Sequence, residues 1–288
     1  IENLDLTNTI STRRMFEGSG MRSIDLSMIS CDNLMTTHRM FANCPFLESV
    51  QFAKVNKPTL LSMYGTFNKC DVLKSVDLSE IDVSGVKLMN CMFEQCPFLV
   101  SVNTDGWDAN SLMFADRMFS ECYLLTDVNT STWGLQNLVD AECMFYECRT
   151  LADLNVSGWN MQKCIQASSM FSGCILLNSV DVSNWKTDQL LDCSHMFGAC
   201  ESLTNIDLSN WNTANCKYLN NMFSGCESLS YVDLSSWNVE GVIDMSLMFF
   251  NCKSLNSIDL ENWKISNVVI TERMFDKCPA PKPDWYEE

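Results

Sequence analysis

The sequence predicts an α/β solenoid that has a parallel strand ribbon on one face and short helical turns on the other. Three observations lead to this prediction. A Met-Phe pair recurs about every 26 residues, each repeat places apolar residues at the same positions, and 47% of the 288 residues are hydrophobic. A unit of this length cannot bury its apolar side alone, so neighbouring repeats are expected to stack and share one continuous core.

The repeat is counted from the Met of each pair, which is taken as position 1. One interval is 25 residues long, and Thr66 takes the place of Met once. The unit reads Met-Phe-x-x-Cys-x-x-Leu-x-x-Val/Ile-Asp-Leu-Ser-x-Trp-Asn, followed by about ten variable residues. This pattern divides the chain into a truncated N-terminal coil over 1–14, an eleven-copy solenoid over 15–278, and a C-terminal cap or tail over 279–288, whose prolines cannot continue a strand ladder.

The first element of each repeat is predicted to be a short strand. In the copy that begins at Met222, Leu229, Val232 and Leu234 stand at positions 8, 11 and 13. The step of two between the last two residues is typical of a strand whose alternate side chains point inward. Position 12 is therefore expected to face solvent.

The second element is predicted to be a short helical turn. Val242, Met245, Met248 and Phe249 follow one another at steps of three, three and one, which is the spacing of one helix face. Each repeat is thus expected to contain a strand, a loop, a helical turn and a loop. Beyond the last repeat, we expect Trp285 to fold over the final coil.

The strand positions carry a resemblance to a known family. The string Leu-x-x-Val/Ile-Asp-Leu-Ser-x-Trp at 203–211 and 229–237 resembles the Leu-x-x-Leu-x-Leu-x-x-Asn core of leucine-rich repeats. With the Met-Phe-x-x-Cys string and the 26-residue period, the chain is similar to the BspA-like class, the bacterial surface protein repeat. The resemblance covers 15–278 and implies a right-handed leucine-rich-repeat solenoid. It also implies a cell-surface or secreted protein, in some cases one that adheres to host proteins, and no catalytic site.

Ten of the sixteen cysteines form a ladder at position 5. Free cysteine behaves as a small hydrophobic residue, so the ladder is interpreted as a stack of buried thiols, although neighbouring Cα atoms are close enough for disulfides. The ladder consists of Cys44, Cys70, Cys96, Cys122, Cys148, Cys174, Cys200, Cys226, Cys252 and Cys278. The other six are Cys31, Cys91, Cys143, Cys164, Cys193 and Cys216, of which Cys193 alone has plausible off-ladder partners, in the columns of Cys164 and Cys216.

The thiols also bear on metal binding and on location. The chain has no Cys-x-x-Cys pair and only two histidines, so neither a metal site nor a cofactor is predicted. Many free thiols are typical of a reducing compartment such as the cytoplasm, which opposes the surface location that the resemblance implies. Complete burial of the thiols, or an anaerobic source, would reconcile the two.

Two further columns are interpreted as core. Seven tryptophans stand at position 16 of successive copies and ten methionines stand at position 1. The alternative for the tryptophans is an exposed platform that stacks on sugars or peptides, whereas strict repetition in every coil favours packing. The tryptophans are Trp107, Trp133, Trp159, Trp185, Trp211, Trp237 and Trp263.

The net charge of −17 limits the partners. Nucleic acids and anionic membrane surfaces reward positive charge, and no apolar run is long enough to cross a membrane, so neither partner is predicted. The sequence also lacks a Gly-rich phosphate loop, a His-Glu-x-x-His string and a Gly-x-Ser-x-Gly string, so no enzyme activity is predicted.

The candidate binding residues lie at the outward position 12. The last four complete copies place Asp181, Asp207, Asp233 and Asp259 there, about 4.8 Å apart along the ribbon. Tyr231, at position 10, is the one aromatic residue in the surrounding Ser- and Asn-rich strip. A row of like charges is destabilising unless solvent, a raised pKa, a cation or a basic partner relieves it. The residues therefore indicate either a solvated acidic face or a protein-binding strip. The expected function is a protein-interaction module, and the alternative is a structural spacer without a ligand.

Overall fold

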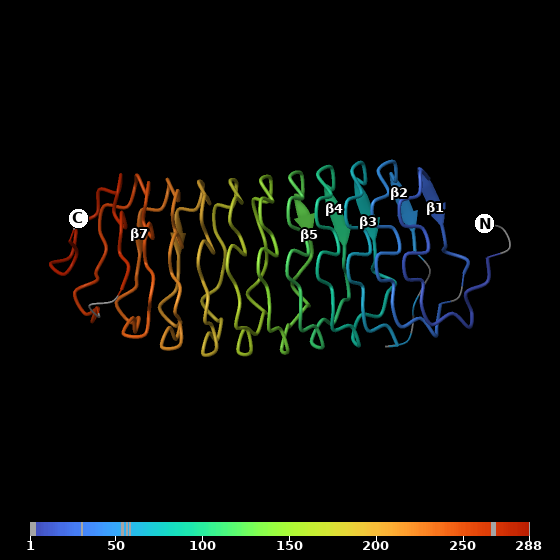
Figure 1. The fold of residues 1–288 in the computed structure, drawn as a ribbon, viewed down its shortest axis with the longest axis horizontal. Helices are drawn as coiled ribbons and strands as arrows, with labels where there is room; N and C mark the ends of the chain where they lie inside the picture. The colour runs from blue at the N-terminus through green and yellow to red at the C-terminus, as the bar shows by residue number, and fades with distance from the viewer. Residues whose placement is uncertain are drawn as a thin grey trace.

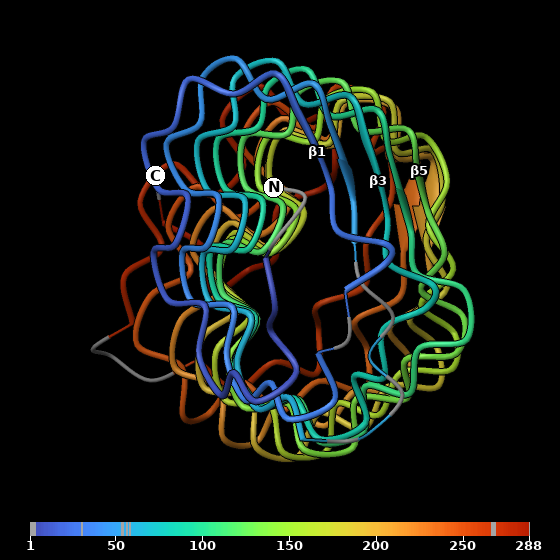
Figure 2. The ribbon, with the colours of Figure 1, turned by 90° about the vertical axis from the view of Figure 1, so that its right-hand side faces the viewer.

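The computed structural model describes residues 4–29, 31–52, 55, 57, 59–265 and 269–287. Successive coils stack side by side along one axis, with the N-terminus at one end and the C-terminus at the other (Figure 1). Seen along this axis, the coils superpose as a closed outline, and the strands lie on one side of it (Figure 2). The stacking of equivalent residues from coil to coil places the whole apolar face in one core.

Seven short parallel strands form the predicted ribbon. Within the described residues they pair as a five-stranded sheet in the order β1-β2-β3-β4-β5 and a two-stranded sheet β6-β7. Equivalent positions are in register, as in the pair Val76 and Val102. The middle residue of each three-residue strand is buried and the last is exposed, which confirms that position 12 faces solvent. The strands are β1 Ser23–Asp25, β2 Ser49–Gln51, β3 Ser75–Asp77, β4 Ser101–Asn103, β5 Asp127–Val128, β6 Asn205–Ile206 and β7 Tyr231–Val232.

The strand expected in every coil is not formed in every coil. Strand pairing is not present at 153–155, 179–181 and 257–259, nor at Leu4–Leu6 of the first coil, although Leu6 is buried. Three of these four interruptions lie just before a tryptophan of position 16, as do the paired strands β4 to β7. From Trp107 onward the indole rings stack with centroids 5.7 to 6.4 Å apart. This spacing is wider than the roughly 4.8 Å between paired strands, yet it does not by itself prevent pairing, since β6 and β7 pair where the rings are 6.3 Å apart.

The core consists of stacked columns of identical residues, as the sequence predicts. The Phe rings at position 2 stack with centroids 5.1 to 5.9 Å apart from Phe16 to Phe275. All seven position-16 tryptophans are buried, which excludes the exposed platform. Six of them donate an indole N–H to a backbone carbonyl of the preceding coil at 3.0 to 3.3 Å, for example Trp185 to Val156. The tryptophan column therefore fills the core and also gives the buried indole N–H groups a hydrogen-bond acceptor.

The prediction of helical turns is wrong, since no helix occurs among the described residues. Each coil instead has left-handed residues on both sides of the Met-Phe pair, as at Arg117 and Glu121, with φ of 56° and 61°. A left-handed residue ends a right-handed helix. The backbone bonds alternate accordingly: the N–H of Phe119 donates to Met144 in the next coil, whereas the N–H of Ser120 donates to Arg117 three residues back.

The same region forms a second ladder between coils. Isolated parallel bridges join position 23 of each coil to position 23 of the next, from Ser11 to Ile270. Val242, Met245, Met248 and Phe249 are all buried, so the apolar spacing correctly indicated which side chains point inward. It did not distinguish a helix from these turns, because consecutive turns that alternate with bonds to the next coil produce the same inward spacing.

The C-terminal tail covers the end of both aromatic columns. The Trp285 ring stacks on Trp263 at 6.2 Å, and its N–H donates to the carbonyl of Leu260 at 3.3 Å. Tyr286 places its ring edge-on against Phe275 at 5.1 Å. The tail thus provides aromatic partners that a further coil would otherwise supply.

Candidate functional site

The four predicted carboxylates lie on the solvent side of the strand face. Asp207 and Asp233 directly follow β6 and β7, whose residues pair in register, Asn205 with Tyr231. Asp181, Asp207 and Asp259 are exposed, and Asp233 is partly exposed. Tyr231 is 54% exposed and lies two residues before Asp233, so both side chains are on the outer side of the same strand.

Each carboxylate is held by a local turn. The Oδ1 atoms of Asp181, Asp207 and Asp233 accept a backbone N–H at 3.0 to 3.2 Å and a Ser hydroxyl at 2.7 Å, both from the residue two positions later. Asp259 accepts the N–H of Glu261 at 3.1 Å. This Asx turn is the reason that Asp, Asn and Ser recur here. Sequence reasoning missed it, although the Asp-x-Ser spacing is its signal.

The turns decide the charge of the row. The hydroxyl and N–H of Ser209 hold the pKa of the Asp207 carboxyl below its usual range, while the Asp233 carboxylate opposes this weakly. Ser235 likewise lowers the pKa of Asp233. The sequence analysis named a raised carboxyl pKa as one way to relieve the repulsion. At Asp207 and Asp233 the pKa is lowered instead, so the repulsion is not relieved in that way. Both carboxylates remain ionised near neutral pH, because hydrogen bonds to the charged form stabilise it.

The ion pairs of the described residues do not include the row. The exposed pairs lie elsewhere, as between Lys253 and Glu227 at 2.7 Å and between Lys264 and Glu240 at 3.3 Å. The four carboxylates consequently stand oriented and without a cationic side chain in the described part of the chain. Such groups are available to a cation or to a basic partner surface.

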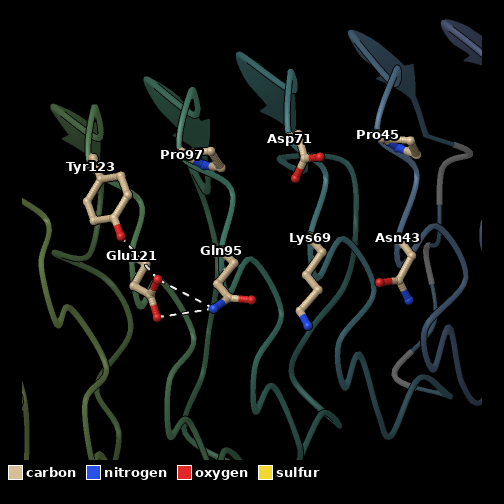
Figure 3. A pocket seen from close by; sticks show the side chains of 8 residues that line it. All are labelled: Asn43, Pro45, Lys69, Asp71, Gln95, Pro97, Glu121 and Tyr123. Carbon is tan, nitrogen blue, oxygen red and sulfur yellow. Dashed lines mark hydrogen bonds between the residues drawn. The ribbon is translucent and has the colours of Figure 1, made fainter.

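The structure also shows a groove that sequence reasoning did not identify. It has a volume of about 490 Å³ and crosses four consecutive coils (Figure 3). The residue at position 4 of each of these coils lines the groove. It is left-handed, with φ between 56° and 61°, and belongs to the turn that follows the Met-Phe pair. Tyr123 and Gln95 both donate to the Glu121 carboxylate, at 3.1 and 3.3 Å. The lining residues are Asn43, Pro45, Lys69, Asp71, Gln95, Pro97, Glu121 and Tyr123.

Exposed apolar side chains stand next to the groove in sequence. Phe46, Phe98 and Leu124, at position 7, are 55%, 52% and 40% exposed. Later coils have Ser202 and Ser228 at this position. The sequence contained a signal for this surface, namely the change from Phe to Ser along position 7. A column that accepts Ser is not buried, so the Phe residues of the same column were to be expected at the surface.

The cysteine ladder is a stack of free thiols, as predicted. All sixteen cysteines are unpaired, and nine of the ten ladder members are buried, with Cys278 partly exposed. The structure adds a reason for cysteine: each thiol from Cys44 to Cys252 donates to a Phe carbonyl of the preceding coil at 3.0 to 3.2 Å. Burial raises the pKa of the Cys226 thiol to about 12. These thiols are structural and weakly reactive.

We expect the thiols to resist alkylation in the folded protein. At pH 8 the first to react with iodoacetamide should be Cys91, Cys143 and Cys278, which are partly exposed. The thirteen buried cysteines should react only after denaturation, and without added reductant. Mass spectrometry of the peptides measures both fractions. Paired ladder cysteines, or ladder cysteines that react freely while the chain is folded, would contradict this interpretation.

The described residues hold no group of three His, Cys, Asp or Glu side chains that could bind a metal ion. His38 stacks on Tyr64 at 4.7 Å, and burial lowers the pKa of His195. Within the same residues, no helix could span a membrane.

A family model described as Mycoplasma protein of unknown function, DUF285, matches residues 61–181 and, in a second alignment, residues 168–286. The chain belongs to the DUF285 family. A comparison with curated proteins gives no match. Among solved structures, this DUF285 chain is similar to a leucine-rich repeat protein from Bacteroides ovatus, at 19% identity and a TM-score of 0.52. The match covers 92% of this chain and 61% of that protein, so the chain spans about three fifths of its length.

A second similar structure is a leucine-rich cell surface protein from Faecalibacterium prausnitzii. It is 18% identical, with a TM-score of 0.38 and coverage of 90% of this chain and 85% of that one. The similarity to the Bacteroides ovatus protein, together with the parallel ribbon, shows that the DUF285 chain has a leucine-rich-repeat fold.

Proposed function

We propose that this DUF285 chain is a protein-interaction module that presents its strand face to a partner with a basic surface. The observation that supports the proposal is the row of Asp181, Asp207, Asp233 and Asp259, which Asx turns orient and which no cationic side chain of the described residues neutralises. The half-exposed Tyr231 provides an aromatic contact beside the row. Preoriented charges favour steering and specificity.

The finer proposal is an adhesin-type repeat domain of the BspA-like class, secreted or exposed at a cell surface, that binds a host or cell-surface protein. The 26-residue Met-Phe-x-x-Cys repeat supports it. Burial of the thiols supports the same location, because a buried thiol with a raised pKa reacts slowly even where the medium is oxidising. The alternative is a spacer that projects other domains and binds nothing itself.

Replacing Asp181, Asp207, Asp233 and Asp259 together by Asn should weaken partner binding roughly tenfold, because several charge pairs of a fraction of a kcal/mol each are lost. Stability should change by less than about 0.5 kcal/mol. Asn129 and Asn155 already make the same bonds to Ser two residues later, so the turns should persist. Binding to a panel of purified extracellular matrix proteins, at low and high salt, measures the first effect, and thermal unfolding measures the second.

Asp77→Asn is the matched control, since Asp77 makes the same turn with Ser79 and stands outside the row. It should leave binding unchanged. Equal affinity of the quadruple variant and the original chain, together with easier unfolding, would show that the row is structural. Absence of salt-sensitive binding to every protein of the panel would favour the spacer.

A further inference from the structure

Cys193 and Cys216 form a second thiol arrangement that differs from the ladder. Their Sγ atoms are 3.8 Å apart, and both residues are free and buried, at 2% and 1% exposure. The ladder thiols from Cys44 to Cys252 each donate to a Phe carbonyl at 3.0 to 3.2 Å, whereas the Cys216 thiol points at the sulfur of Cys193. The nearest carbonyls to the Cys216 thiol, those of Leu191 and Tyr218, are farther than the ladder acceptors, at 3.6 Å. The sequence left Cys164 and Cys216 as equal partners for Cys193, and the structure selects Cys216.

Backbone hydrogen bonds already connect the chain segments that carry Cys193 and Cys216. The N–H of Cys193 donates to the carbonyl of Tyr218 at 3.0 Å, and the N–H of Lys217 donates to the carbonyl of Leu191 at 2.8 Å. Asp192 and Tyr218 form a parallel bridge between these bonds. A disulfide has an S–S length of about 2.0 Å, so the sulfur atoms must approach by about 1.8 Å while two fixed chain segments hold their Cα atoms.

We propose that Cys193 and Cys216 are a site of disulfide formation. A low-molecular-weight disulfide acts as the oxidant, and the bond that forms between the two cysteine sulfur atoms links adjacent coils. One thiolate attacks the reagent, forms a mixed disulfide and releases one small thiol. The second thiolate attacks the protein sulfur of that intermediate and releases the second small thiol. One S–S bond breaks and one forms, two electrons pass to the reagent, and the two protons end on the released thiols.

The bridge would close the loop over 193–216, which contains β6 and Asp207 of the acidic row. The hydrogen bond from Cys216, together with burial, raises the pKa of the Cys193 thiol, so little thiolate exists in the folded chain at neutral pH. Oxidation of the folded protein is therefore slow, and oxidation during refolding is fast, because the thiols are then accessible. The site links the stability of this part of the solenoid to the redox state of its surroundings.

The experiment treats the full chain with oxidised glutathione, once in the folded state and once during refolding from urea. We expect the intact mass to fall by two hydrogens, a peptide map without reductant to contain one linkage between Cys193 and Cys216, and the unfolding temperature to rise by several degrees. The folded sample should reach the same product more slowly. No linkage in either sample, or a linkage among other cysteines, would overturn the proposal.

The variants replace each cysteine by a residue that already occurs at the same repeat position in another coil. They are therefore expected to fold, and the test does not depend on a folding defect. Cys193→Ala follows Ala141 and Ala167, which stand at the same repeat position, and Cys216→Val follows Val242. Both variants should fold and should lose the linkage and the rise in unfolding temperature. Cys164→Val, at another buried position of the Cys216 column, should keep both. A linkage that survives in Cys193→Ala would also overturn the proposal.

Discussion

Deletion of residues 144–169, one complete coil, is expected to leave a folded solenoid that is one coil shorter. The cut brings Phe119 next to Phe171 and Trp133 next to Trp185, so every column stays in register. Each coil contacts only its neighbours, and the two new neighbours have the same contact surfaces as the old ones. Cooperative unfolding should persist, with a midpoint a few degrees lower.

Deletion of residues 144–156, half a coil, should have a far larger effect. After this cut, the Phe and Trp columns on one side would no longer face Phe and Trp on the other side. The two parts could then neither share a core nor form both the strand pairing and the position-23 bridges between them. We expect loss of the single cooperative transition in circular dichroism and calorimetry. Equal loss of cooperativity in both deletions would argue against the stacked-coil architecture.

The second large effect is expected at alkaline pH. Burial raises the pKa of Cys226 in the ladder and of Cys164 outside it to about 12, so these thiols stay protonated in the folded chain well above neutral pH. In the unfolded chain cysteine has a pKa of about 8.5. The stabilisation is thus complete below about pH 8.5 and is lost as pH rises toward the folded values, because the unfolded chain then releases protons that the folded chain retains.

The magnitude follows from the number of thiols. Each buried thiol removes up to about 1.4 kcal/mol of unfolding free energy per pH unit above 8.5. For the eight buried ladder cysteines whose pKa is raised, the total slope approaches about 11 kcal/mol per pH unit, which is comparable with the whole stability of a domain. We expect cooperative unfolding between about pH 9 and pH 11. Urea titrations at several pH values measure the slope.

A single substitution provides the control for this slope. Cys226→Ser keeps a donor for the Phe197 carbonyl and does not titrate in this range. It should reduce the slope by about 1.4 kcal/mol per pH unit, which corresponds to one proton. An unchanged slope, or stability that stays constant to pH 11, would show that the ladder thiols are not the titrating groups.

The candidate surfaces could be predicted only in part. The period assigns Asp181, Asp207, Asp233 and Asp259 to one outward column, and the structure places them on the solvent side. It does not reveal the Asx turns, because these depend on where the backbone bends after the strand. The groove beside Pro45 and Pro97 was also missed, since it is formed by residues of four coils at a place where left-handed residues direct side chains outward.

By itself, the sequence determined the stacking of coils, the register and the identity of the buried columns, because strict repetition means that any residue that must be inside in one coil must be inside in all. Only the tertiary structure decided the conformation of the Met-Phe segment and the partner of Cys193. Inward spacing at steps of three and one is compatible with a helix or with consecutive turns. The bonds that a helix would make within itself run here to the next coil, as from Phe119 to Met144, and those bonds exist only once the coils are stacked.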